Sequence, residues 1–249
     1  MKTHWRKTVL ISIIVISFIV MMNIKPISQD LSYHDFADKR EFSGIPNFLN
    51  VITNFPFALF GVMGIFYNNK IRVGEARWSW LTLFSGVTLV TIGSGYYHLN
   101  PVNGTLLWDR LPISIAFMGL FSAILSEFVN PKIERYFLVP SIFIGIMSVL
   151  IWQFTDDLRF YAWVQFFPLL SLPLVVVLYK SRQTHVKYLL FAFIFYLFAK
   201  LFEFYDIGIF SLLGEQLSGH SLKHIFASLS VLSLYLMLQK REKIRRQKK

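Results

Sequence analysis

The chain has 249 residues, of which 55% are hydrophobic and 17% aromatic, and its mean hydropathy is +0.52. A soluble domain of this length cannot bury so much apolar surface in one core. The composition therefore excludes an ordinary globular enzyme and indicates an all-α, polytopic membrane helix bundle. The absence of cysteine excludes disulfides, thiol catalysis and cysteine-ligated zinc.

Apolar runs of membrane-spanning length recur along the whole chain, with short polar segments between them. We expect eight transmembrane helices, because about 20 apolar residues cross the hydrocarbon core. Their predicted ranges are 8–22, 47–67, 78–97, 107–128, 136–154, 160–179, 188–205 and 220–238. A signal peptide and an uncleaved anchor both fit the first range, and the absence of a small-residue cleavage pattern in MMNIKPISQD favours the anchor.

Charge alternates between the segments that join the predicted helices. The segments 68–77, 130–135, 180–187 and 240–249 are basic, whereas 153–159 and 205–219 are acidic or neutral. Because Lys and Arg mark the cytoplasmic side, eight helices place both termini and every basic segment in the cytoplasm. The net charge of +11 follows mostly from this topology. Nucleic-acid binding by the basic tail is the alternative, but contact with anionic lipid explains the tail more simply, so we expect no nucleic-acid partner.

Polar residues gather where three of the predicted helices meet the outer face. Ser94 and His98 are four residues apart near the end of one helix, and His220 and His224 have the same spacing at the start of the last. This spacing places both members of a pair on one helix face. Asp109 enters the membrane at the same depth. Three neutral imidazoles with an open fourth position are typical of a catalytic zinc site.

Each of these residues also has a simpler interpretation. A single histidine at a helix end is commonly an interfacial residue, and helices produce the H-x-x-x-H spacing by chance. Asp109 is adjacent to Arg110, so a simple ion pair is an alternative, and Ser94 alone can serve helix packing. The convergence of all five at one depth favours function, because ionisable groups inside a membrane are costly.

The order and spacing of these five residues resemble the alkaline ceramidase family, which belongs to a wider membrane-hydrolase superfamily with the adiponectin-type receptors. The segment IPNFLNVITNFPFALFG, residues 45–61, resembles the opening helix of that family, and WDRLP at 108–112 matches its Asp-x-Leu-Pro block. The resemblance covers about residues 33–238. The extra first helix resembles bacterial members, which implies a location in the bacterial inner membrane with the active site near the outer, periplasmic face.

The resemblance implies a single integral membrane domain over residues 1–249. Residues 1–30 would form the extra N-terminal transmembrane anchor helix and a linker, 31–238 the seven-helix hydrolase core, and 239–249 a basic cytoplasmic tail.

The implied activity is zinc-dependent cleavage of the amide bond of ceramide-like membrane lipids, which releases a sphingoid-type amine and a free fatty acid. Zn²⁺ would be bound by His98, His220 and His224. Asp109 would orient or deprotonate the attacking water, and Ser94 would hydrogen-bond the oxyanion or that water. Two alternatives stay open: a non-catalytic or receptor-like protein with a structural zinc site, and a lipid-remodelling relative that acts on ester-linked lipids.

Ceramidases of this family also carry a calcium site before and at the start of the opening core helix. The residues with oxygen ligands in the corresponding region are Asp35, Asp38, Glu41 and Asn47. An amide stands where an acidic ligand is expected, and Lys39 and Arg40 lie among them, so a hydrogen-bonded or ion-paired cap over the site is the favoured alternative. Glu203 and Asp206 are candidates for outer partners of the histidines, or for simple interfacial solvation.

Overall fold

The structure is a computed structural model that describes residues 4–71, 76–181 and 183–242. All the helices and strands assigned within these residues are helices. They are α1 (His4–Asn23), a 3-10 turn (Leu31–His34), α2 (Phe48–Ile52), α3 (Phe55–Asn68), α4 (Arg77–Leu99), α5 (Asn103–Phe128), α6 (Lys132–Thr155), α7 (Arg159–Leu178), α8 (Lys187–Phe204), α9 (Asp206–Leu212) and α10 (Gly219–Lys240). The predicted all-α membrane bundle is confirmed.

Six spans in the described residues are long and apolar enough to cross a membrane: α1, α2 with α3, α5, α6, α7 and α10. The pair α8 and α9 makes a seventh, bent by 85° where the two helices join. The remaining predicted span coincides with α4, which has 23 residues but is not among these apolar spans. It packs between α3 and α5, so its polar side chains face protein instead of lipid.

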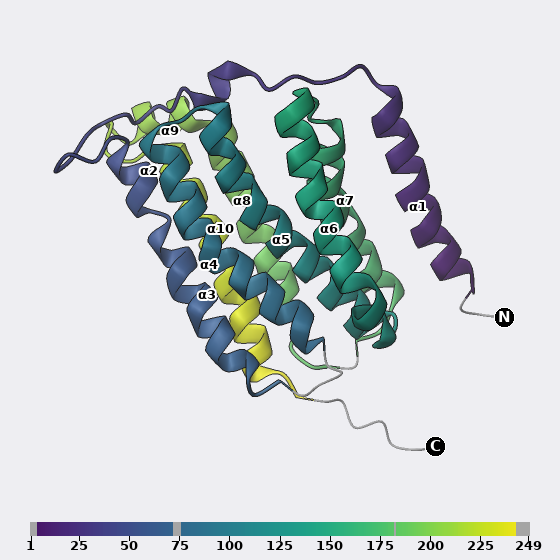
Figure 1. Ribbon diagram of the computed structural model, residues 1–249. Helices are drawn as coiled ribbons and strands as arrows, with labels where there is room; N and C mark the ends of the chain where they lie inside the picture. Colours follow the sequence, from purple (N-terminus) through teal and green to yellow (C-terminus); the bar gives the residue numbers. More distant parts are fainter. Residues whose placement is uncertain (1–3, 72–75, 182, 243–249) are drawn as a thin grey trace.

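The structure departs from the predicted spans at two places. The second predicted span is interrupted at Thr53 and Asn54, two residues before Pro56, whose missing N–H is tolerated in the first turn of α3. The segment 205–219, predicted as a loop, contains the short helix α9, which lies across the end of the bundle (Figure 1). Both departures occur at the end of the bundle that holds the histidines.

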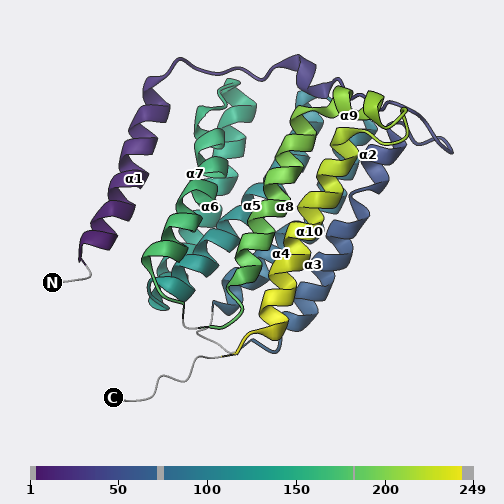
Figure 2. The ribbon, with the colours of Figure 1, turned by 180° about the vertical axis from the view of Figure 1, so that it is seen from behind.

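The helices form one bundle in which α5 lies centrally and α1 lies at the periphery against α7 (Figures 1 and 2). The most extensive helix contact is that of α4 with α5, where Gly86 and Gly93 let the two backbones approach. A Cβ at Gly93 would lie 2.0 Å from the carbonyl oxygen of Trp108. On the other side, α10 packs against α8 and α3. Since α4, α5 and α10 carry the candidate residues, these contacts position the site.

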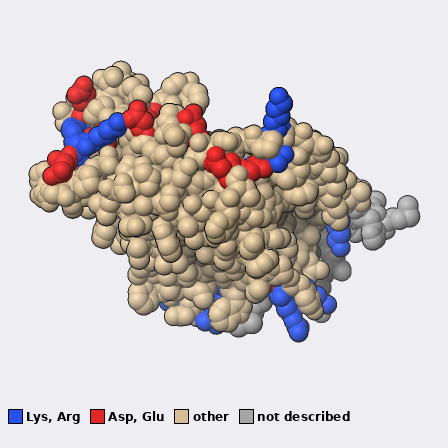
Figure 3. Space-filling view, turned by 45° about the horizontal axis from the view of Figure 1, so that its top comes forward, with Lys and Arg blue, Asp and Glu red and all other residues tan. Residues whose placement is uncertain are grey.

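The linker between α1 and α2 runs across the end of the bundle where α4 and α8 finish and α5 and α10 begin (Figure 1). Side chains of both signs gather at this end, whereas Lys and Arg line the opposite edge (Figure 3). The start of α1 and the end of α10 both lie toward that basic edge. The basic residues predicted in 72–75, at 182 and in the tail 243–249 lie outside the described residues.

Candidate metal centre

Three histidine side chains converge at the end of the bundle beneath the linker. His98 ends α4, and His220 and His224 lie in the first two turns of α10. The Nε2 atom of His98 is 3.3 Å from that of His224 and 3.4 Å from that of His220. All three side chains are buried. Within the described part of the chain, they form the one group of His, Asp and Glu side chains whose spacing suits a metal ion.

The donor set fits a tetrahedral zinc ion. Zinc–imidazole bonds of about 2.0–2.1 Å at tetrahedral angles place two nitrogens about 3.3–3.4 Å apart, which is the separation of His98 from each of its partners. Three neutral nitrogen ligands leave one coordination position open, whereas a structural zinc site is closed by four protein ligands. Imidazole also suits zinc better than it suits Ca²⁺ or Mg²⁺.

The first turn of α10 is held in place by its neighbours. Ser218 caps the helix, since its hydroxyl accepts a hydrogen bond from the Ser221 N–H at 3.1 Å. Asp206, at the start of α9, accepts one from the His220 N–H at 2.7 Å. A Cβ at Gly219 would lie 2.3 Å from the carbonyl oxygen of Phe202, so only glycine allows this close approach of α10 to α8. The bend between α8 and α9 therefore positions His220.

The linker closes the histidine cluster from the outer side. The Phe36 ring is 4% exposed, and its centroid lies 4.4 Å from the ring of His220 and 4.8 Å from that of His98. The Ala37 N–H donates to Asp206 at 2.9 Å, which ties this part of the linker to the start of α9. Apolar contact on the outer side leaves the cluster open toward the interior of the bundle.

The outer nitrogen of one ligand has a protein partner. Nδ1 of His224 lies 3.0 Å from the Thr53 hydroxyl at the break between α2 and α3. The carbonyl oxygen of His98 accepts a hydrogen bond from the Asn47 amide at 2.9 Å. The contact with Thr53 orients the imidazole of His224 and selects its tautomer, whereas the contact with Asn47 holds the backbone near the end of α4. The interrupted second span thus supports the cluster.

Ser94 and Asp109 lie together near the histidines. Both are buried, and the Ser94 hydroxyl interacts with the Asp109 carboxylate across the α4–α5 contact. Both side chains line an internal cavity, which the ring of His224 also reaches. Arg110 does not pair with Asp109 but donates to Gln29 at 2.6 Å and stacks 3.9 Å over the ring of Trp152. The simple ion-pair interpretation of Asp109 is therefore wrong.

The cavity has a volume of about 750 Å³ and lies between α4, α5, α7, α8 and α10. Its end near His224 is polar, and the rest is lined mostly by apolar side chains as far as Val186 and Lys187 at the opposite end of α8. Val177 of α7 and Leu190 of α8 line the cavity and are 81% and 58% exposed. The cavity therefore reaches the surface of the bundle between these two helices. Its size and lining suit an apolar ligand with one polar end.

Lys223, which the sequence analysis did not single out, lies at the polar end of this cavity. Its Nζ atom is 2.7 Å from a Glu203 oxygen and 3.3 Å from Nε2 of His220. The other oxygen of Glu203 pairs with Lys200. In the sequence, the lysine lies directly before His224, within the segment GHSLKH at residues 219–224. Its position on α10, three residues after His220, is a signal that could have placed it beside the histidines.

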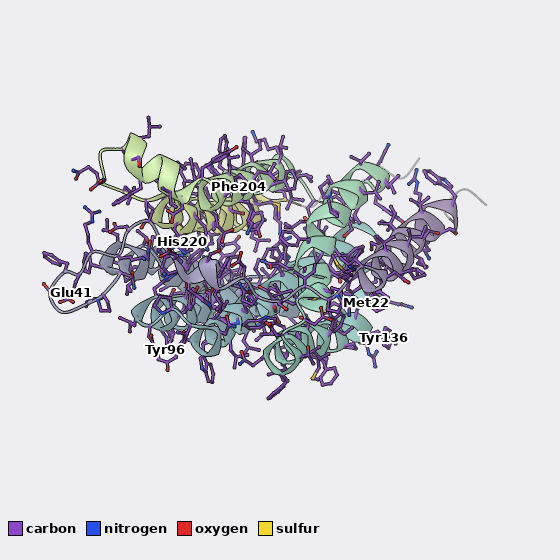
Figure 4. All side chains as sticks on the ribbon, turned by 90° about the horizontal axis from the view of Figure 1, so that it is seen from above. Met22, Glu41, Tyr96, Tyr136, Phe204 and His220 are labelled. Atoms are coloured by element: carbon purple, nitrogen blue, oxygen red, sulfur yellow. The ribbon has the colours of Figure 1, made fainter. Side chains whose placement is uncertain are left out.

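The four candidate calcium residues are not brought together. Asp35 pairs with Lys39, Asp38 pairs with Arg40 at 2.7 Å, and Asn47 is bound to the backbone of His98. Glu41 is exposed at the edge of the molecule, away from His220 (Figure 4). Burial raises the pKa of Asp38, but the guanidinium and the backbone N–H of Arg40 both donate to its carboxylate and hold the pKa below its ordinary value. The ion-paired cap accounts for these contacts, and calcium binding stays a prediction without a ligand cluster.

The remaining acidic and histidine candidates brace the site without contacting the histidine nitrogens of the cluster. Asp206 binds two backbone N–H groups, and Glu203 binds lysines instead of an imidazole. His34 lies apart from the cluster, with its two ring nitrogens 2.8 Å from Tyr97 and from Asn103.

Comparison with protein families covers the part of the chain that forms the site. A family model described as ceramidase matches residues 42–249, which include every helix from α2 to α10 and all five residues of the site. Comparison with individual curated proteins gave no significant match. The helix α1 and most of the linker precede the matched region. Because the match covers most of the chain, this protein belongs to the ceramidase family.

Proposed function

We propose that this protein uses zinc to hydrolyse the amide bond of ceramide-like lipids within the membrane. The observation that carries the proposal is the convergence of three buried histidine nitrogens within 4.8 Å of one another, two of the pairs at 3.3 and 3.4 Å, with His224 lining the polar end of an apolar cavity. Membership of the ceramidase family supports the amide bond as the target. The products would be a sphingoid-type amine and a free fatty acid.

His98, His220 and His224 would hold the metal ion. Zinc bound in this way would supply Lewis acidity and lower the pKa of a water at its open position to about 7. Asp109 accepts the proton of the attacking water and delivers it to the nitrogen of the leaving amine. The Ser94 hydroxyl, which interacts with the Asp109 carboxylate, would orient it. The presence of this buried pair beside the histidines favours catalysis over a purely structural metal site.

The apolar length of the cavity would hold the acyl chain of the substrate. A lipid diffusing in the bilayer can reach this space between α7 and α8, where exposed residues of both helices line it. The cavity excludes bulk water, so charged groups near the scissile bond act in a low-dielectric environment. Phe36 shields the histidines from the aqueous phase on the other side.

The orientation in the membrane is part of this proposal. We place the basic edge of the bundle, both chain ends and the tail 239–249 in the cytoplasm, and the histidine cluster near the periplasmic face of a bacterial inner membrane. The charge distribution of the described helix ends supports this arrangement. The chain would then form a single integral domain, with 1–30 as the added anchor and linker and 31–238 as the core.

The test is metal analysis of the purified protein together with a screen for fatty acid released from ceramides. His220→Ala should lose both bound zinc and amide hydrolysis. A matched control is His185→Asn, because His185 is outside the cluster and its φ of 65° is one that asparagine tolerates. An active, zinc-loaded His220→Ala protein would refute the proposal. A wild-type protein that binds zinc but releases no fatty acid from ceramides would favour the receptor-like alternative, and release from ester lipids alone would favour the remodelling alternative.

A further inference from the structure

Lys223 is largely buried, lines the cavity and lies close to the histidine cluster. Its side chain is 18% exposed and lines the polar end of the cavity. Glu203, on α8, holds the ammonium group at 2.7 Å, and Nε2 of His220 is 3.3 Å from the same nitrogen. Two helices thus fix a positive charge at the edge of the proposed metal site.

Among the described residues, this ammonium group contacts one carboxylate, that of Glu203, and one imidazole, that of His220. A Lys ammonium has three N–H donors, and Glu203 accepts one of them. The donor on the side of His220 faces the nitrogen that points toward His98, 3.4 Å away. In a metal-loaded protein the lone pair of that nitrogen would be engaged by the metal. The N–H is then available to an oxygen atom placed at the cluster from the cavity.

Two other polar groups line the same cavity. The Ser94 hydroxyl interacts with Asp109. The Arg110 guanidinium donates to Gln29 through Nη2 and stacks on the ring of Trp152, while its Nη1 is buried without a partner. Lys223 is the cation with a contact to a histidine nitrogen of the cluster in the described residues, so we assign the developing negative charge to it.

We propose that Lys223 binds the carbonyl oxygen of the scissile amide and stabilises the negative charge that develops on it. The inference rests on the proposed function and assigns the oxyanion role to Lys223, with Ser94 orienting Asp109. Attack by water forms a C–O bond and shifts the carbonyl π electrons to the oxygen, where Lys223 donates its hydrogen bond. The electrons return as the C–N bond breaks, and the water protons leave with the amine through Asp109. Glu203 is a positioning residue for Lys223.

The decisive variant is Lys223→Met, which keeps the length of the side chain and removes its charge. Removal of one oxyanion donor typically lowers kcat by about 100-fold or more. We expect a loss of this size with the zinc content unchanged. Lys240→Met, at the opposite end of the same helix, is the matched control. Lys223→Arg should recover part of the lost activity, because it restores a positive donor.

A binding measurement tests the same charge without catalysis. Palmitic acid carries a carboxylate that can occupy the position of the carbonyl oxygen, whereas hexadecanol is a neutral analogue of similar length. By titration calorimetry on the purified zinc-loaded protein, Lys223→Met should weaken palmitate binding by about 10-fold or more and leave hexadecanol binding unchanged, as expected for loss of a charge-assisted hydrogen bond.

The two measurements separate this inference from the proposed function. If wild type hydrolyses ceramide and Lys223→Met keeps both its activity and its palmitate affinity, the role of Lys223 is refuted and the proposed function stands. If wild type hydrolyses no ceramide, the proposed function fails, and with it the catalytic role of Lys223. Selective loss of palmitate binding would then identify an anion subsite only. Equal loss of palmitate and hexadecanol binding in Lys223→Met would also overturn the inference, because it indicates a collapsed cavity.

Discussion

Gly93→Ala tests whether the close approach of α4 to α5 positions the site. The added Cβ would lie 2.0 Å from the carbonyl oxygen of Trp108 and 2.8 Å from its carbonyl carbon. The first distance falls about 1.4 Å short of the 3.4 Å at which ordinary contact begins. Since the clashing atoms belong to the backbone, rotation of a side chain cannot relieve them. The two helices must separate by about 1 Å.

The expected cost follows from two opposing effects. Overpacking against a backbone that cannot move aside costs about 3 kcal/mol. Alanine regains about 1 kcal/mol of helix propensity over glycine. We therefore expect Gly93→Ala to lower the free energy of unfolding by about 2 kcal/mol. Gly95→Ala is the matched control, because no atom lies within 4 Å of its added Cβ. That variant should gain up to about 1 kcal/mol from propensity alone.

The gap between the two variants is about 3 kcal/mol, which corresponds to about 6–12 °C in Tm for a chain of this size. Circular dichroism melts in one detergent measure it directly. Ceramide hydrolysis should also fall about 100-fold in Gly93→Ala, because a shift of about 1 Å separates Asp109 from the histidines of the neighbouring helices. Equal Tm and equal activity of the two variants would show that the α4–α5 contact does not position the site.

Three further variants address the linker and the surroundings of the site. Phe36→Ala should lower the Tm and speed zinc loss to a chelator several-fold, because the ring shields the cluster; an unchanged release rate would contradict this role. Arg110→Lys should cost about 1–2 kcal/mol in a thermal melt, since lysine cannot reproduce the flat stacking on Trp152, and an unchanged Tm would count against that contact. Asp38→Asn should lower the Tm at neutral pH but not in acid. The pKa of Asp38 is depressed by Arg40, so its stabilising effect is present above about pH 4 and is lost as the pH falls through the lower folded value; melts at several pH values would show no such convergence if the pair were unimportant.

The bundle itself was predictable from sequence because the membrane removes alternatives. In hydrocarbon, each backbone N–H and C=O must be bonded within its own helix, so every span is a local property of about 20 residues. All eight predicted ranges coincide with helices of the structure, including the less apolar α4. The 85° bend between α8 and α9 was not predicted. It depends on the contact of Asp206 with the first turn of α10, which lies outside any local window.

The histidine pair on α10 and the Ser94–His98 pair were also predictable, because a spacing of four residues places two side chains on one helix face whatever surrounds the helix. The position of the Lys223 ammonium group beside the cluster was not predictable. Lys223 is adjacent to His224 in the sequence, but its side chain is held by Glu203, which belongs to a different helix. The lack of convergence of the candidate calcium residues was not predictable either. Asp35 and Asp38 form ion pairs with Lys39 and Arg40, which are close to them in the sequence.

The sequence by itself determined the family, the helical spans and the identity of the chemical groups, because these depend on composition and on short, local spacings. Tertiary structure alone decided which groups act together. His98 and His224 are separated by 126 residues in the chain, yet their nitrogens lie 3.3 Å apart. That distance results from glycines that let α4 approach α5 and α10 approach α8, and from the linker that closes over the cluster. Such contacts arise from the packing of whole helices, and no local pattern encodes them.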